Sequence, residues 1–154
     1  MMLIKKIGAR KIRDSRGQQT IEVSINSQKA SAPSGKSTGK YETLPYRHSL
    51  DWNIKSINTL KIPFEVSSFQ DLKKIEMHIK KTFKLQQPQE FGANALFALE
   101  SAILKALAKE QKRELWQIIN PQARRLPIPV GNAIGGGLHS TYYQYRTVFQ
   151  EFLL

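Results

Sequence analysis

The fold of this chain is decided by the stretch Asp14-Ser15-Arg16-Gly17-Gln18-Gln19-Thr20-Ile21-Glu22-Val23-Ser24-Ile25. From Thr20 to Ile25 polar and apolar residues alternate, which places Ile21, Val23 and Ile25 on one face of a β-strand. Residues 4–13 alternate more loosely. The four residues that open the stretch have the composition of a turn. The sequence therefore predicts a β-hairpin.

The segment from Lys29 to Glu42 is small and polar. A segment of this composition has no apolar face that could pack against a core, so we expect a loop. Its glycines, among them Gly35 and Gly39, would give the backbone freedom to move.

Two later segments have the spacing of helices. From Asp71 to Phe83 the apolar residues recur every three or four positions and the lysines lie between them, which predicts an amphipathic helix. The segment from Ala93 to Ala108 is apolar on nearly every side, so we expect a buried helix. A short helix or turn is expected from Trp116 to Ile119. The large apolar residues of the buried helix are Leu96, Phe97, Leu99, Ile103, Leu104 and Leu107.

The C-terminal part has a different character. Leu126-Pro127-Ile128-Pro129-Val130 and the residues from Val148 to Leu154 are expected to be strands, so we divide the chain into residues 1–125 and 126–154. A strand that ends a chain carries unpaired backbone groups unless another segment docks beside it. We therefore expect an interrupted protein.

Length and composition exclude several classes of protein. The chain has 154 residues, of which 40% are hydrophobic, enough for a packed core but too few residues for a complete (β/α)₈ barrel of about 250. There is no cysteine, which excludes disulfides, thiolate metal sites and cysteine nucleophiles. No apolar run approaches the roughly 18 residues of a membrane span, and the N-terminus lacks a secretory signal. We expect a cytoplasmic protein without membrane contact.

The charge raises the question of nucleic acid. There are 24 Lys and Arg residues against 12 Asp and Glu, a net charge of +12. Tyr142, Tyr143 and Tyr145 beside Arg146 offer rings on which bases could stack. However, the basic residues are spread evenly and no nucleic-acid fold motif accompanies them. A basic solvated surface, or one matched to an acidic partner, is the favoured interpretation.

The segment Gly35-Lys36-Ser37-Thr38 has the end of a phosphate-binding P-loop, but its surroundings do not fit. The mechanism needs a glycine five residues before Gly35, where this chain has Ala30. Pro33, inside the loop, has no N–H to offer a phosphate. A P-loop is therefore not expected.

The same loop belongs to a set of five motifs whose order resembles the enolase family, over nearly the whole chain. The motifs are Asp14–Gly17 with Thr20–Val23, Pro33–Gly39 with Glu42, Gly92–Ala95, Asn132–His139 and Gln150–Phe152. The resemblance implies an α+β fold: a three-stranded antiparallel meander followed by helices over residues 1–125. Residues 126–154 would hold the first two strands of an incomplete TIM-like barrel. It also implies the Mg²⁺-dependent interconversion of 2-phosphoglycerate and phosphoenolpyruvate plus water.

The resemblance also assigns roles to single residues. The serine that matches Ser37 ligates the second Mg²⁺ when a mobile loop closes, and Gly35, Lys36, Thr38 and Gly39 belong to that loop. The residues that match His139 and Gln150 contact substrate. The glutamate that matches Glu151 binds substrate and takes part in proton transfer. Without the ordered motifs, Ser37, His139 and Glu151 would be read as ordinary surface residues.

The sequence departs from the family at several positions and, most of all, in what it lacks. Lys36 stands where the family has a small alanine, which adds a cation beside the expected metal ligand. The general-base lysine, the carboxylates of the first Mg²⁺ and six barrel strands all lie later in the family and have no counterpart here. We therefore expect the isolated chain to be inactive.

Two explanations remain open for the missing part. In the favoured one, a complementary barrel chain completes a split enzyme, with dimerisation as in the family. In the other, the chain is an inactive fragment or a basic nucleic-acid-binding protein that retains the fold.

Overall fold

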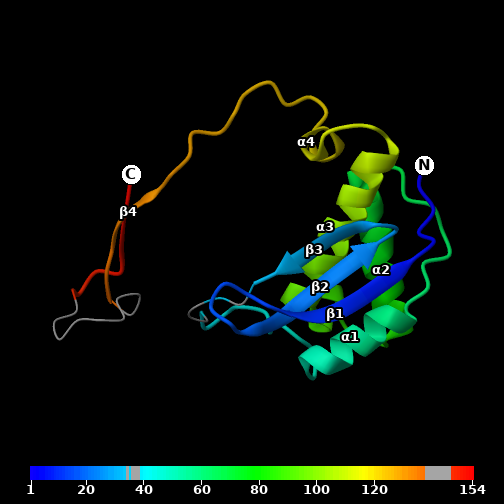
Figure 1. The fold of residues 1–154 in the computed structure, drawn as a ribbon, viewed down its shortest axis with the longest axis horizontal. Coiled ribbons are helices and arrows are strands. Elements are labelled where there is room, and N and C mark those ends of the chain that lie inside the picture. Colours follow the sequence, from blue (N-terminus) through cyan, green and yellow to red (C-terminus); the bar gives the residue numbers. More distant parts are fainter. Residues whose placement is uncertain (34, 36–38, 138–146) are drawn as a thin grey trace. The chain divides into compact units, whose positions relative to one another are not determined.

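The computed structural model describes residues 1–33, 35, 39–137 and 147–154. These form two compact units, Met1–Ala123 and Arg124–Leu154, which are described in turn (Figure 1). In the described residues, no helix has the length and apolar character needed to cross a membrane.

The first unit contains a three-stranded antiparallel sheet in the order β1-β2-β3. The hairpin predicted from the sequence is confirmed: β1 (Ile7–Arg13) pairs with β2 (Gln19–Ile25). Asp14 forms the turn, because its carboxylate accepts hydrogen bonds from the backbone N–H groups of Arg16 and Gln18, both at 2.9 Å. Gly17 completes the turn with a φ of +76°.

The third strand, β3 (Gln28–Ala32), corrects the expectation that residues 29–42 form only a loop. Ala30 and Ala32 alternate with polar residues and are 7% and 5% exposed. The segment is a strand because these small side chains let a helix pack closely against the sheet. The meander that the resemblance implied is therefore confirmed.

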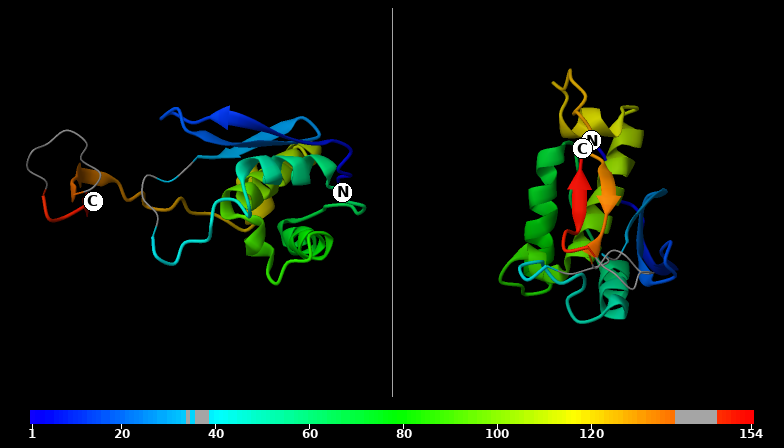
Figure 2. Two further views of the ribbon diagram at one scale, coloured as in Figure 1. Left: turned by 90° about the horizontal axis from the view of Figure 1, so that it is seen from below. Right: turned by 90° about the vertical axis from the view of Figure 1, so that its left-hand side faces the viewer.

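Helices form a second layer on one side of this sheet (Figure 2). They are α1 (Leu50–Thr59), α2 (Leu72–Thr82), α3 (Ala93–Glu110) and α4 (Leu115–Ile119), with short 3₁₀ helices η1 (Phe69–Asp71) and η2 (Pro88–Phe91). The expected helices in the regions of α2, α3 and α4 are confirmed, whereas α1 was not predicted. Ser49 caps α1 by accepting a hydrogen bond from the N–H of Trp52 at 3.0 Å.

The core lies between the sheet and α3. Ile21, Val23 and Ile25 of β2 are fully buried, as are Leu99 and Leu107 of α3. Among the large apolar residues of α3 that are expected to be buried, Phe97 is the exception. Phe97 is 59% exposed, and it lines a hollow that β3, α3 and α4 bound.

Asp71 fixes the start of α2. Its carboxylate lies 2.6 Å from the Lys74 ammonium and accepts hydrogen bonds from the N–H and hydroxyl of Ser67, both at 2.8 Å. These contacts, that of Lys74 first, hold the pKa of Asp71 well below its usual range. The carboxylate thus stays ionised and satisfies backbone donors before the helix.

The second unit contains a two-stranded antiparallel sheet of β4 (Asn132–Gly135) and β5 (Glu151–Leu153). The strand expected over residues 126–130 is wrong, since those residues precede β4 without strand pairing. Pro127 and Pro129 lack the N–H that a ladder requires, which explains the difference. The second expected strand is present but starts at Glu151 rather than Val148.

Candidate functional site

The loop that carries the predicted metal ligand lies between β3 and α1. Lys36, Ser37 and Thr38 lie outside the described residues, whereas Gly35 and Gly39 are within them. Gly39 marks the end of the glycine-rich motif, and its N–H donates to Glu42 Oε2 at 3.0 Å. The Glu42 N–H donates in turn to the Gly39 carbonyl at 3.2 Å. Glu42, which the motif included without a role, therefore closes a turn at this end of the loop.

The two stems of this loop are joined by two hydroxyl groups, those of Thr20 and Tyr46. The Thr20 hydroxyl in β2 donates to the carbonyl of Ala32, where the loop begins. Tyr46 lies on the far stem, and its hydroxyl is 3.1 Å from that of Thr20. Because the Thr20 proton is directed to Ala32, the Tyr46 hydroxyl is the donor in the second bond. Thr20 is 1% exposed, so its bond to Ala32 is shielded from water, whereas the bond to the half-buried Tyr46 is partly shielded.

The Gly92 motif holds the far stem in place. The backbone N–H groups of Ala93 and Asn94 donate to the carbonyls of Leu44 and Pro45, at 2.9 and 3.1 Å. Gly92 has a φ of +106°, and a Cβ there would lie 2.6 Å from Tyr46 Cα. Only glycine permits this close approach between the start of α3 and the stem.

Asn53 adds a second anchor to the same stem. Its amide nitrogen donates to the Phe91 carbonyl at 2.6 Å, and its amide oxygen accepts from the Arg47 N–H at 3.0 Å. Asn53 is fully buried. Sequence reasoning missed both Tyr46 and Asn53, since a single tyrosine or asparagine carries no local pattern that distinguishes it from a surface residue.

Gln150 and Glu151 lie in the second unit, beside the glycines that follow β4. The Gly136 N–H donates to the Gln150 carbonyl at 2.7 Å. A Cβ on Gly136 would lie 2.7 Å from the Phe149 carbonyl, so glycine is required for this contact. Glu151 opens β5 opposite Gly135 and is exposed. The structure therefore brings Gln150 and Glu151 together with the glycine motif, while His139 lies outside the described residues.

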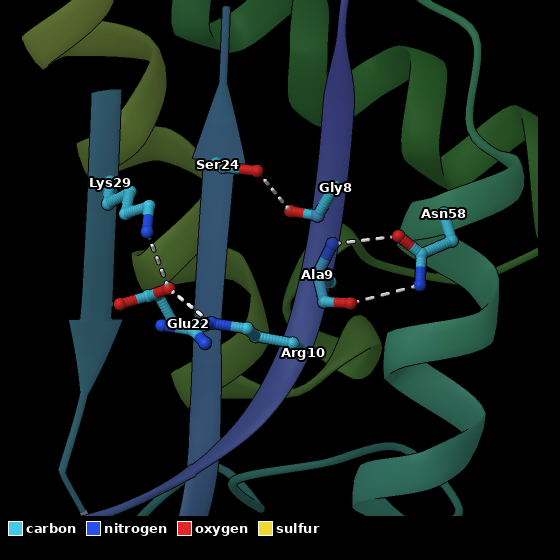
Figure 3. Close-up of a pocket in the computed structure, with 7 residues that line it drawn as sticks. All are labelled: Gly8, Ala9, Arg10, Glu22, Ser24, Lys29 and Asn58. Atoms are coloured by element: carbon cyan, nitrogen blue, oxygen red, sulfur yellow. Dashed lines mark hydrogen bonds and ion pairs between the residues drawn. The ribbon is translucent and has the colours of Figure 1, made fainter. Parts of the chain in front are cut away.

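A hollow of about 320 Å³ on the sheet contains charged groups, but they satisfy one another (Figure 3). Glu22 lies 2.7 Å from Arg10 Nε and 3.6 Å from Lys29 Nζ. The hydrogen bond from Arg10 lowers the pKa of Glu22 despite its partial burial. An ionised, paired carboxylate of this kind acts as a structural group rather than as a general base.

Comparison with known proteins decides the family. The sequence matches the family described as "Enolase, N-terminal domain" over residues 4–119. It is also 31% identical, over 178 aligned positions, to a protein named enolase from Mycoplasmopsis synoviae (strain 53). This chain belongs to the enolase family. The alignment covers 100% of the chain and 38% of that relative. The enolase N-terminal domain thus accounts for the sheet and helices of the first unit.

Enolase family membership implies a divalent metal, and the described residues can be tested for the donors. Within residues 1–33, 35, 39–137 and 147–154, no group of three or more His, Cys, Asp or Glu side chains is placed to hold a metal ion.

A carboxyl group with a strongly shifted pKa lies away from the enolase motifs, between α2 and α3. Glu100 is half-buried against Glu76, and its Oε1 is buried without a hydrogen-bond partner among the described residues. Burial, together with the negative charge of the neighbouring Glu76, raises the pKa of Glu100 to about 7. This pair is placed to make stability depend on pH.

We expect Glu100→Gln to stabilise the domain above neutral pH. The folded pKa of about 7 exceeds the ordinary value of 4.5, so the folded state retains a proton that the unfolded state loses. The wild-type contribution is complete below pH 4.5 and is lost as the pH rises to 7. At pH 8 the variant should gain about 1–2 kcal/mol, a figure reduced because the group is partly exposed to solvent.

Urea unfolding at pH 4 and pH 8 measures this difference. Glu110→Gln, an exposed position at the end of the same helix, is the matched control and should change stability equally little at both pH values. A gain from Glu100→Gln that is the same at both pH values would contradict the prediction.

Proposed function

We propose that this chain supplies the N-terminal part of an enolase-type active site that interconverts 2-phosphoglycerate and phosphoenolpyruvate plus water. The match to the enolase N-terminal domain over residues 4–119 carries this proposal. The tied loop stems support it, because a loop that contributes to catalysis needs fixed ends from which to approach the substrate. The proposal places the protein in the cytoplasm with its substrates.

The roles proposed for single residues follow from the family motifs. Ser37 would provide one metal ligand from the loop that includes Gly35, Lys36, Thr38 and Gly39. His139 and Gln150 would contact substrate. Glu151 would bind substrate and take part in proton transfer near the leaving hydroxyl. Lys36 would add a positive charge that suits the substrate phosphate.

We propose Mg²⁺ as the metal, since hydroxyl and carboxylate oxygens suit this ion. When bound, it would stabilise the negative charge that develops on the substrate carboxylate. Ser37 alone cannot hold it. The carboxylate ligands and the general base would therefore come from barrel residues other than these 154.

We further propose that a second chain supplies those barrel residues, and that the complete enzyme dimerises as its family does. A net charge of +12 favours an acidic partner. The first experiment is affinity purification of the chain from its native cells, followed by identification of bound polypeptides and a coupled assay for phosphoenolpyruvate. A stoichiometric barrel polypeptide and Mg²⁺-dependent activity are expected.

In this complex, Glu151→Gln should lower kcat by about 100-fold, because the amide cannot exchange a proton. Glu65→Gln, at an exposed position in the first unit, is the control and should retain full activity. Unchanged activity in the Glu151 variant would exclude the role given to that residue. A chain that binds no barrel polypeptide and has no activity would favour the alternative of an inactive fragment.

The nucleic-acid alternative has no specific support in the described residues. Tyr142, Tyr143, Tyr145 and Arg146, on which it depends, lie outside them. The charge alone does not distinguish nucleic acid from an acidic protein.

A further inference from the structure

Among the described residues, no strand pairs with the outer edge of β3, whose backbone groups there point away from β2. The ammonium of Lys105, from α3, donates to the Lys29 carbonyl at 3.1 Å, which shows that this carbonyl points away from β2. In an antiparallel strand, residues two apart direct their backbone groups to the same side. The N–H and carbonyl of Ser31 therefore also point outward.

The opposite edge of the sheet, at β1, is covered by a side chain that occupies its backbone groups, whereas the edge at β3 is not covered in this way. At β1, the side-chain amide of Asn58 accepts from the Ala9 N–H at 2.7 Å and donates to the Ala9 carbonyl at 3.0 Å (Figure 3). This amide imitates a neighbouring strand and blocks further pairing. At β3, by contrast, the contact from Lys105 comes from a long, flexible side chain that can move aside.

An apolar groove runs beside the β3 edge. It has a volume of about 590 Å³ and is bounded by β3, α3 and α4. Its apolar wall is formed by Phe97, Leu104, Leu115 and Ile119. Phe97 is 59% exposed and Ile119 is 45% exposed. This is unusual beside an edge strand, which proteins commonly protect with charged side chains or cover with a helix or loop. Apolar exposure next to an open strand edge favours strand addition.

The charges around the groove select the chemistry of the partner. Lys29 and Lys105 lie among its lining residues, and Glu22 is the one acidic lining residue in the described part of the chain. Glu22 is already paired, at 2.7 Å with Arg10 and at 3.6 Å with Lys29. The groove therefore suits carboxylates. It disfavours a second copy of this chain, because Lys29 and Lys105 of the two copies would repel one another.

We propose that an extended acidic segment of a partner polypeptide binds here as a fourth strand. Its backbone pairs with Ser31 and Lys29, and its alternate apolar side chains enter the groove between α3 and α4. Its carboxylates lie opposite Lys29 and Lys105, and the Lys105 ammonium exchanges the backbone carbonyl for a carboxylate. This binding surface lies wholly within the first unit and does not depend on the proposed enzymatic function.

A random heptapeptide library, selected against the full chain, tests this proposal. Enriched peptides should alternate Asp or Glu with Val, Ile, Leu or Phe. Their affinity, measured by fluorescence anisotropy, should fall about tenfold in Ser31→Pro, which removes an outward N–H, and about tenfold in Lys105→Glu. Lys109→Glu, four residues further along α3 and outside the groove, is the control with the same charge change and should bind normally.

Circular dichroism establishes that each variant is folded, and Lys105→Glu keeps the test decisive if Ser31→Pro does not fold. Peptides without this alternation, or peptides that bind Lys105→Glu as well as Lys109→Glu, would overturn the proposal. Self-association of the chain that is lost in Ser31→Pro would also overturn it, in favour of a second copy at this edge.

Discussion

Gly92→Ala is expected to lower the free energy of unfolding by about 3–5 kcal/mol, the sum of backbone strain and a steric clash. The backbone of Gly92 has a φ of +106°, which residues other than glycine rarely adopt. The added methyl group would lie 2.6 Å from Tyr46 Cα and 2.7 Å from the Pro45 carbonyl. Both contacts are with backbone atoms, so rotation of a side chain cannot relieve them.

Urea unfolding, followed by circular dichroism, measures this loss. Gly17→Ala is the matched control, because Gly17 also has a positive φ, of +76°, but in the described part of the chain no atom beyond Gly17 and its two neighbours lies within 4 Å of the Cβ position. That variant should lose only about 1 kcal/mol, from backbone strain alone. Equal losses in the two variants would show that the approach of the stem to Gly92 contributes nothing.

The second large effect is expected at Phe91, whose replacement by alanine should cost about 3–5 kcal/mol. Phe91 is fully buried, and its ring centroid lies 5.2 Å from that of Phe83 and 5.9 Å from that of Trp52. Alanine would leave a cavity among these rings, and the rigid start of α3 cannot collapse into it. Because Trp52 borders the cavity, its fluorescence should also change in the folded state.

Phe97→Ala provides the comparison for this prediction. The same side chain is removed, but Phe97 is 59% exposed, so the loss should stay below about 1 kcal/mol. Denaturant midpoints of the two variants measure the difference. A loss at Phe97 as large as that at Phe91 would mean that the groove wall belongs to the stabilising core.

Local patterns were sufficient where one face of an element is continuously apolar. The alternation of Ile21, Val23 and Ile25 predicted β2, and the spacing of Leu72, Ile75 and Ile79 predicted α2. They did not lead to α1, although Leu50, Ile54 and Ile57 recur there at helical spacing; the helix also buries the polar residues Asn53 and Ser56. They also failed at residues 126–130, where apolar residues suggested a strand that the prolines prevent.

For the candidate site, the ordered motifs identified the family but not the contacts that position the loop. Gly92-Ala93-Asn94 was recognised as a motif, yet its role became visible only when its backbone N–H groups were found on the carbonyls of Leu44 and Pro45. The roles of Ser37, His139, Gln150 and Glu151 stay predictions.

The sequence by itself determined the hairpin and the helices in the regions of α2, α3 and α4, because periodicity is a property of neighbouring residues. The order of the motifs along the chain identified the enolase family. Only the tertiary structure showed which residues form β3 and that Thr20 joins Ala32 to Tyr46. Thr20 and Tyr46 are 26 residues apart, and Ala30 and Ala32 are buried only because α3 covers them. Such contacts depend on how distant segments pack, and no local pattern of residues encodes that packing.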